Sequence, residues 1–250
     1  TTIKELGGLT LGSINGAFAL TLNTLGSGVA TFGGAVGNST NLTSLTTAPS
    51  AGSAGITISG GSITTTGDLS LGNAITLGAN TTLTSANTIT LGTAITGAGF
   101  SLSITNNAII SAAISGFSSV TVGGTTSLGG NVTTTGAQTY TGAVTMTADR
   151  TLSSTSNGAI NLAAINGAFA LTISNGSGAI TLSTVGATTP LTTFTLQGTG
   201  LNTLNGDINT SGAVDLKGTS RQNTFAANRA ITTTNSSGNG NITLGTTNSG

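Results

Sequence analysis

The sequence has no cysteine, no histidine and no tryptophan, and only five basic and five acidic residues among 250. Without cysteine there is no disulfide and no thiolate metal site, and without histidine as well a transition-metal centre is not expected. So few charges provide neither the clustered Lys and Arg that bind nucleic acid nor a polybasic patch for a membrane surface. The charged fraction of 4% is far below the roughly 25% of a soluble domain, so an ordinary globule is not expected either.

Long apolar runs and helical patterns are also missing. No run approaches the roughly 18 apolar residues of a membrane helix, so we expect no membrane insertion of this segment. Residues 1–5 do not have the shape of a signal peptide, and we expect any targeting signal to lie upstream. Glycine is abundant (40 residues) but proline is rare (2 residues), which excludes collagen. A hydrophobic fraction of 36% with zero net charge disfavours disorder, so the composition favours a folded, Thr- and Gly-rich β structure.

Three blocks of sequence recur along the chain, which indicates stacked repeats. Residues 14–22 (INGAFALTL) return at 165–173, and a third version stands at 95–104. Residues 60–67 (GGSITTTG) align with 129–136 and 206–212, and residues 42–45 align with 117–120 and 191–194. We therefore predict one β-helical segment over residues 1–250, a fragment of a longer array, with three tandem units at approximately 9–88, 89–159 and 160–241.

The middle unit shows short strands in which apolar and polar residues alternate, bounded by Gly, Asn and Ser. Nine strands fall within 69 residues, which at three strands per coil gives coils of about 23 residues. This pattern predicts an all-β, right-handed parallel β-helix without helices, in one continuous solenoid. About eleven coils with a rise of about 4.8 Å each would make a rod roughly 50 Å long. The nine predicted strands are 89–91, 102–104, 108–110, 120–122, 126–128, 132–134, 138–140, 144–146 and 151–153.

The alternation assigns a place to individual side chains. We expect five leucines to point inward: Leu20, Leu91, Leu102, Leu162 and Leu171. Three phenylalanines at matching repeat positions are interpreted as stacked or core-filling aromatics: Phe18, Phe100 and Phe169.

Turn residues also recur. Three glycines that close strands are predicted to need positive φ: Gly67, Gly136 and Gly212. Three Asx residues ahead of strands are predicted to make left-handed turns and to bond nearby backbone: Asn80, Asp149 and Asn228. Residues 48–55 are predicted to form a surface loop at a corner.

Few residues in the sequence are candidates for catalytic groups. The acids are Glu5, Asp68, Asp149, Asp207 and Asp215, and none recurs in all three units. Asp207 and Asp215 could approach each other, but a carboxylate dyad is not the favoured interpretation. The group of Asp215, Lys217 and Arg221 is the one cluster that resembles the charged face of a β-helical lyase, and we interpret it as a solvated corner. The calcium-binding Gly-Gly-x-Gly-x-Asp repeat and a phosphate loop are both missing. We therefore predict no catalytic, cofactor-binding or metal-binding residue, no cofactor and no enzymatic activity.

The repeats resemble those of filamentous-haemagglutinin-like exoproteins over nearly the whole chain. The resemblance rests on residues 29–36 (VATFGGAV), 42–45 (LTSL), 60–67 (GGSITTTG) and 136–144 (GAQTYTGAV). It implies a β-helical adhesin exported to the surface or exterior of a Gram-negative bacterium, with a host or cell-surface ligand as partner. It supplies no site residues that could be carried over to this sequence.

Two functions of different class follow. The first is a structural or adhesive rod, whose coils contact flanking repeats end to end because neither terminus supplies a capping segment. The alternative is an ice-binding face built from Thr-x-Thr strands, locally suggested by residues 88–90 and 64–66. This alternative is disfavoured because no strand position keeps Thr-x-Thr coil after coil.

Overall fold

The computed structural model describes residues 1–5, 7–25, 27–49, 55–235 and 240–248. These residues form 33 β-strands and no helix, and the strands pair in parallel in three sheets that the chain visits in turn. At three strands per coil they make about 11 coils, so the predicted all-β parallel solenoid is confirmed. The chain divides into two compact units, residues 1–124 and 125–250, and each is described by itself below.

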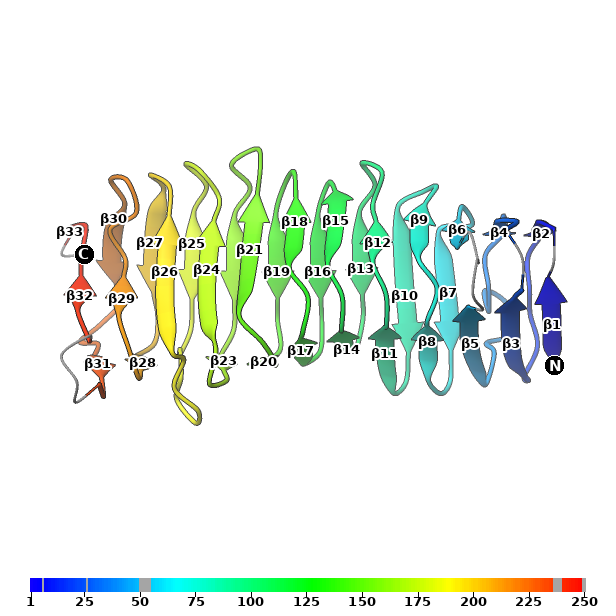
Figure 1. The fold of residues 1–250 in the computed structure, drawn as a ribbon, viewed down its shortest axis with the longest axis horizontal. Helices are drawn as coiled ribbons and strands as arrows, with labels where there is room; N and C mark the ends of the chain where they lie inside the picture. Colours follow the sequence, from blue (N-terminus) through cyan, green and yellow to red (C-terminus); the bar gives the residue numbers. More distant parts are fainter. Residues whose placement is uncertain (6, 26, 50–54, 236–239, 249–250) are drawn as a thin grey trace. The chain divides into compact units, whose positions relative to one another are not determined.

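Unit 1 contains three parallel sheets, here called 1A, 1B and 1C, and the chain passes from A to B to C (Figure 1). Sheet 1A consists of β1 (Thr2–Glu5), β3 (Ala19–Thr24), β5 (Ser44–Pro49), β8 (Leu69–Leu71), β11 (Thr88–Leu91) and β14 (Asn107–Ile110). Sheet 1B consists of β2 (Leu9–Leu11), β4 (Ala30–Phe32), β6 (Ile56–Ile58), β9 (Ile75–Leu77), β12 (Ile95–Thr96) and β15 (Ile114–Phe117). Sheet 1C consists of β7 (Ser62–Thr65), β10 (Thr81–Ser85), β13 (Leu102–Ile104) and β16 (Val120–Val122), and isolated bridges at Ile14 and Val36 extend it.

Unit 2 repeats this arrangement in sheets 2A, 2B and 2C. Sheet 2A contains β17 (Thr126–Leu128), β20 (Val144–Met146) and β23 (Ile165–Asn166), and the bridge residue Val185 connects them to β28 (Ile208–Thr210) and β31 (Ile231–Thr233). Sheet 2B contains β18 (Val132–Thr134), β21 (Arg150–Ser154), β24 (Ala170–Ser174), β26 (Thr193–Gln197), β29 (Val214–Asp215) and β32 (Ile242–Thr243). Sheet 2C contains β19 (Gln138–Tyr140), β22 (Ile160–Leu162), β25 (Ile180–Leu182), β27 (Leu201–Leu204), β30 (Gln222–Phe225) and β33 (Thr246–Asn248).

Most strands are three or four residues long, with apolar residues inward on either side of an outward Thr or Ser. In β9, Ile75 and Leu77 are both buried and Thr76 between them is exposed. Parallel stacking places each inward side chain on the equivalent side chain one coil away, so an apolar column fills the interior. All nine predicted strands are present, and the five predicted inward leucines are all at most 3% exposed.

The predicted coil of 23 residues does not hold as a constant. Paired residues are as few as 18 positions apart, as for Leu102 and Val120, and as many as 28 apart, as for Val214 and Ile242. Two short strands escaped the sequence prediction, β12 and β15, so the stretch from β11 to β21 holds eleven strands and not nine. Eleven is not a multiple of three, and this has a structural consequence.

Copies of one sequence motif lie on different sheets. In unit 1, Ile14 pairs with Val36 in sheet 1C before Leu20 enters sheet 1A, whereas its counterpart Ile95 lies in sheet 1B and Leu102 lies in sheet 1C. The second motif behaves in the same way: Val132 (in 129–136) and Ile208 (in 206–212) occupy equivalent motif positions in unit 2 but lie in sheets 2B and 2A. The sequence repeat is therefore not a whole number of coils, and each copy presents its loop at another corner.

Corners are held together by Asx side chains that reach the next coil. Asn80 Oδ1 accepts the N–H of Ser101 at 3.0 Å, and Asp149 Oδ1 accepts the N–H of Ala170 at 2.8 Å. For Asn80 and Asp149 the predicted bonds to nearby backbone were therefore wrong, because the partner lies 21 residues ahead. The same contact is made by Asn15, Asn131, Asn157, Asn166 and Asp207. The predicted left-handed turns were wrong as well, since none of Asn80, Asp149 and Asn228 has a positive φ.

The predicted positive φ at the strand-closing glycines was wrong, since none of the three is among the residues with positive φ. Two of them, Gly67 and Gly212, are required instead by close approach, because a Cβ there would lie 2.5 Å from the carbonyl oxygen of Thr43 or Thr192 in the previous coil. The carbonyl oxygen of each of the three glycines also accepts a hydrogen bond from the hydroxyl of the buried Thr two residues earlier, at 2.6–2.7 Å. Of the predicted loop 48–55, residues 48 and 49 extend β5, and residues 50–54 lie outside the described residues.

Candidate functional site

The outward side chains of sheet 1B form a hydroxyl column. One residue in each of six successive strands points outward, and the six are in register from coil to coil. Coils in a sheet are about 4.8 Å apart, so the column repeats at that spacing. Because the strands are two to four residues long, the face carries one such column and not the two that Thr-x-Thr would give. Its members are Thr10, Thr31, Thr57, Thr76, Thr96 and Ser115.

Sheet 2B has longer strands and therefore two parallel columns. Thr151, Thr172 and Thr195 are in register in one column, which continues to Asp215. In the second column the hydroxyls of Thr133 and Ser153 are 3.1 Å apart, and Ser174 and Gln197 follow. As expected, Thr-x-Thr itself does not recur from coil to coil at one strand position. The related pattern Thr-x-Ser does recur on two successive strands, as Thr151 and Ser153 on β21 and Thr172 and Ser174 on β24.

The two places singled out for Thr-x-Thr do not continue. On β11, Thr88 and Thr90 pair with Asn107 and Ile109 of the next coil. In the other place Thr65 points inward and is 2% exposed, so only its two neighbours face out.

The predicted solvated corner of Asp215, Lys217 and Arg221 is wrong for the arginine. Arg221 is completely buried, whereas Lys217 is exposed. Asp215 does not pair with either cation; its Oδ1 accepts the backbone N–H of Lys217 at 2.9 Å. The three residues therefore do not form a charged face of the kind that a polysaccharide lyase would need.

The Arg221 guanidinium is bound by neutral oxygen atoms from the two preceding coils. Nε and Nη2 both donate to the Gln197 carbonyl, at 3.0 and 2.8 Å, and Nη1 donates to Asn202 Oδ1 at 2.9 Å and to the Gly178 carbonyl at 3.4 Å. Nη2 also donates to Asn175 Oδ1. These bonds use all five N–H groups of the side chain. Burial lowers the pKa of Arg221 to about 10, so it is still a cation at neutral pH. It has no donor left for a ligand, and its role is to fasten coils together.

A second buried polar group surrounds Tyr140. The Gln138 side chain, which is completely buried, donates to the carbonyls of Ser153 and Val132 at 2.8 and 3.2 Å and to the Thr134 hydroxyl at 3.2 Å. The Tyr140 hydroxyl donates to Gln138 Oε1 at 3.2 Å. Burial raises the pKa of Tyr140 well above its ordinary value. This network is internal and offers no group to solvent.

Acidic side chains do not gather. Asp207 Oδ1 accepts the N–H of Ala230 at 3.0 Å at one corner, and Asp215 Oδ1 accepts that of Lys217 in sheet 2B, so the two carboxylates serve different strands. Across the residues that the structure describes, no three His, Cys, Asp or Glu side chains lie close enough to hold a metal ion.

The three phenylalanines interpreted as stacked or core-filling aromatics lie at corners and are half-buried, so the core-filling interpretation was wrong. Phe18 precedes β3, Phe100 precedes β13 and Phe169 precedes β24. The interior aromatics are Phe32, Phe117, Phe194 and Tyr140, which are at most 2% exposed. The matched phenylalanines follow a turn, and the alternation that marks inward positions begins only with the strand.

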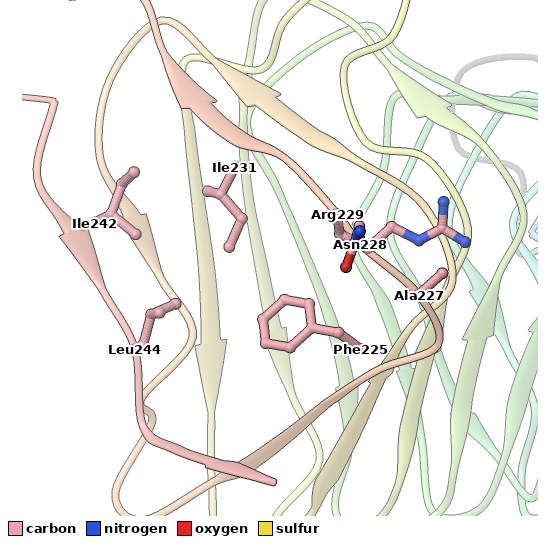
Figure 2. Close-up of a pocket in the computed structure, with 7 residues that line it drawn as sticks. All are labelled: Phe225, Ala227, Asn228, Arg229, Ile231, Ile242 and Leu244. Atoms are coloured by element: carbon pink, nitrogen blue, oxygen red, sulfur yellow. The ribbon is translucent and has the colours of Figure 1, made fainter. Parts of the chain in front are cut away.

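Two hollows occur in unit 2. The first, of about 630 Å³, is apolar and lies at the last coil, between Phe225, Ile231, Ile242 and Leu244 (Figure 2). The second, of about 380 Å³, is polar and lies beside the short strand β29, between Thr195, Gln197, Asp215 and Thr219. It can hydrogen-bond small polar molecules, but one carboxylate is too few for a calcium site.

Comparison with known proteins adds no identity: no protein-family model, no curated protein and no solved structure matches this chain. Within the described ranges there is no helix that could span a membrane.

Proposed function

We propose that the chain is a structural segment, a rigid spacer within a large bacterial surface or secreted β-helical protein. The main support for this proposal is that the sequence repeat does not span a whole number of coils. Motif copies that move from sheet to sheet cannot build one conserved face, but each copy still supplies the same inward residues and corner bonds. The repeats therefore preserve the residues that hold neighbouring coils together, and not a particular outer surface.

The contacts between coils support a role as a stable spacer. Inward Leu, Ile and Val columns bury nearly all of their surface, and each coil bonds its neighbours through backbone ladders and Asx corners. In a solenoid, stability is a sum of such nearest-neighbour contacts, so coils can be added without redesign.

A spacer can be tested by changing its length. Duplicating one coil, residues 69–88, should leave the circular dichroism spectrum per residue unchanged and should lengthen the maximum dimension in small-angle X-ray scattering by about 5 Å. A duplication that unfolds the chain or leaves the dimension unchanged would argue against the proposal.

The resemblance to filamentous-haemagglutinin-like repeats supports an extracellular or outer-membrane-associated location and an adhesive role for the protein that contains this segment. Under this proposal the segment is not an enzyme and binds no cofactor or nucleic acid. Binding of the purified chain to host cells or extracellular matrix, compared with a β-solenoid of unrelated sequence, tests adhesion separately from the spacer role.

An ice-binding role is the second candidate, and the hydroxyl column of sheet 1B is the specific observation in its favour. Regular hydroxyls can order water, but a single column gives a narrow face. Thermal hysteresis of the chain should then fall when a bulky residue interrupts the column, as in Thr76→Tyr, and should be retained in Thr121→Tyr, which is exposed on sheet 1C. Absence of thermal hysteresis in the unmodified chain would eliminate this candidate.

A further inference from the structure

Asparagine followed by glycine is the dipeptide in which the asparagine side chain most readily loses its amide, because glycine has no Cβ to shield the backbone nitrogen that attacks. The glycine nitrogen attacks Asn Cγ: a C–N bond forms, the Cγ–Nδ2 bond breaks, and ammonia leaves with the proton of the glycine amide. Water then opens the cyclic imide to give aspartate or isoaspartate. Six asparagines precede a glycine in this chain: Asn15, Asn157, Asn166, Asn175, Asn205 and Asn239, of which Asn239 lies outside the described residues.

Two of these pairs lie in copies of the same motif and are held in the same way. The side-chain oxygen of Asn15 accepts the N–H of Ser39 at 2.9 Å, and the N–H of Gly16 donates to the Thr40 carbonyl at 3.0 Å. Both reacting groups are therefore tied to the loop of the next coil. The equivalent bonds of the second copy run from the Thr188 N–H to Asn166 Oδ1 at 2.9 Å and from the Gly167 N–H to the Thr189 carbonyl at 3.1 Å.

Two further pairs are protected by other contacts. Asn157 Oδ1 accepts the N–H of Ser177 at 2.9 Å, and the N–H of Gly158 donates to the Ser154 hydroxyl at 2.9 Å. Asn175 is completely buried, and both polar atoms of its side-chain amide are hydrogen-bonded inside the solenoid. In each of these four pairs the asparagine side chain must leave its hydrogen-bond partners before it can reach the glycine nitrogen.

The pair Asn205 and Gly206 has neither kind of protection. It lies at the corner between β27 and β28, and the Asn205 side chain is exposed. Among the described residues, none is hydrogen-bonded to the Asn205 side chain or to the Gly206 N–H. The backbone N–H of Asn205 donates to the Leu182 carbonyl at 2.8 Å, which occupies neither reacting group. A Cβ on Gly206 would lie 2.5 Å from the Thr184 backbone nitrogen, so the fold itself requires the glycine that makes this asparagine reactive.

We infer that Asn205 is a deamidation site of the folded chain, and the one that reacts first among the described Asn-Gly pairs. Breaking two hydrogen bonds before reaction lowers the reactive population about tenfold or more, and Asn205 does not have to break them. Either product places a new carboxylate two residues from Asp207, in a chain with only five acidic residues. The isoaspartate product also lengthens the main chain by one carbon atom between β27 and β28, which belong to different sheets.

Tandem mass spectrometry of peptides from the intact chain, sampled during incubation at mildly alkaline pH, measures the rate at each asparagine. In the folded chain Asn205 should be modified at least about tenfold faster than the four protected asparagines, for the population reason given above. In guanidinium chloride all five should react at similar rates, because each is followed by glycine and none is folded. That comparison makes the protected asparagines matched controls within one chain.

Two results would overturn the inference. One is a folded-state rate at Asn15, Asn157, Asn166 or Asn175 that equals or exceeds the rate at Asn205. The other is suppression of the Asn205 rate by folding to the same degree as the rates of those four asparagines, which would show that the packing of Gly206 against the previous coil protects the pair as well as hydrogen bonds do.

Discussion

Replacing Arg221 by alanine should destabilise unit 2 by about 3 kcal/mol. The substitution removes five hydrogen bonds and leaves three buried acceptors, the Gly178 carbonyl and the side-chain oxygens of Asn175 and Asn202. The fourth acceptor, the Gln197 carbonyl, belongs to an exposed residue and can be solvated. A buried acceptor without a partner costs about 1–3 kcal/mol. Relief from burying a cation, visible in the lowered pKa of Arg221, offsets part of that cost, which is why we take the low end for each acceptor.

Urea unfolding monitored by far-UV circular dichroism measures this loss, with amide hydrogen exchange to confirm that it falls on β25, β27 and β30. Arg221→Met keeps most of the volume without the donors and should lose nearly as much as the alanine variant. Arg229→Ala, which removes an exposed arginine of the same unit, should stay within about 0.5 kcal/mol of the unmodified chain. If Arg221→Met were as stable as the unmodified chain, packing and not hydrogen bonding would account for the stabilisation by Arg221.

Other substitutions test the core, the corners and the buried phenol. Leu171→Ala should cost about 2–5 kcal/mol in urea unfolding because Leu171 is fully buried, whereas Leu201→Ala on the surface should cost well under 1 kcal/mol. Gly37→Ala should lower the melting temperature because Gly37 has a φ of 71° and a Cβ there would collide with the Thr64 carbonyl oxygen, whereas a Cβ on Gly12 meets nothing within 4 Å, so Gly12→Ala should not lower it. The folded-state pKa of Tyr140 is raised, so its stabilising effect is complete below pH 10 and is lost as the pH rises further, at about 1.4 kcal/mol per pH unit. Tyr140→Phe should therefore be less stable at pH 7 by about 1 kcal/mol, for its lost hydrogen bond, and more stable above about pH 11; tyrosinate absorbance of this single Tyr reports the unfolding of the unmodified chain.

Much of the fold could be predicted from the sequence, because alternation over three residues is enough to mark a strand and its inward side. Leu102 and Leu171 were placed correctly on that basis alone. The strands β12 and β15 were missed because Ile95 and Ile114 each stand beside glycines or small residues with little alternation around them. Without these two strands the repeat was counted as nine strands, a multiple of three. The true count of eleven, which moves each motif copy to a different sheet, could therefore not be seen.

The buried arginine could not be predicted from its neighbours in sequence. Lys217 and Gln222 suggest a solvated turn, and the partners of Arg221 lie 19 to 46 residues earlier. One signal was available: Asn202 and Asn223 occupy inward positions of strands where alternation calls for an apolar residue, and Asn202 Nδ2 donates to Asn223 Oδ1 at 2.8 Å. Consecutive polar residues at inward positions indicate a buried polar network, and such a network needs a donor.

Successive coils stack in parallel and in register, so that Thr57 and Thr76 are direct neighbours on sheet 1B. Because the chain has no cysteine, spin labels can be placed at these two positions alone and their separation read from continuous-wave electron paramagnetic resonance. Labels at 57 and 76 should show strong dipolar broadening, as expected for strands about 4.8 Å apart, and labels at 57 and 82, on sheets 1B and 1C, should show weaker broadening. Unbroadened spectra from the 57 and 76 pair would contradict a solenoid with parallel, in-register coils.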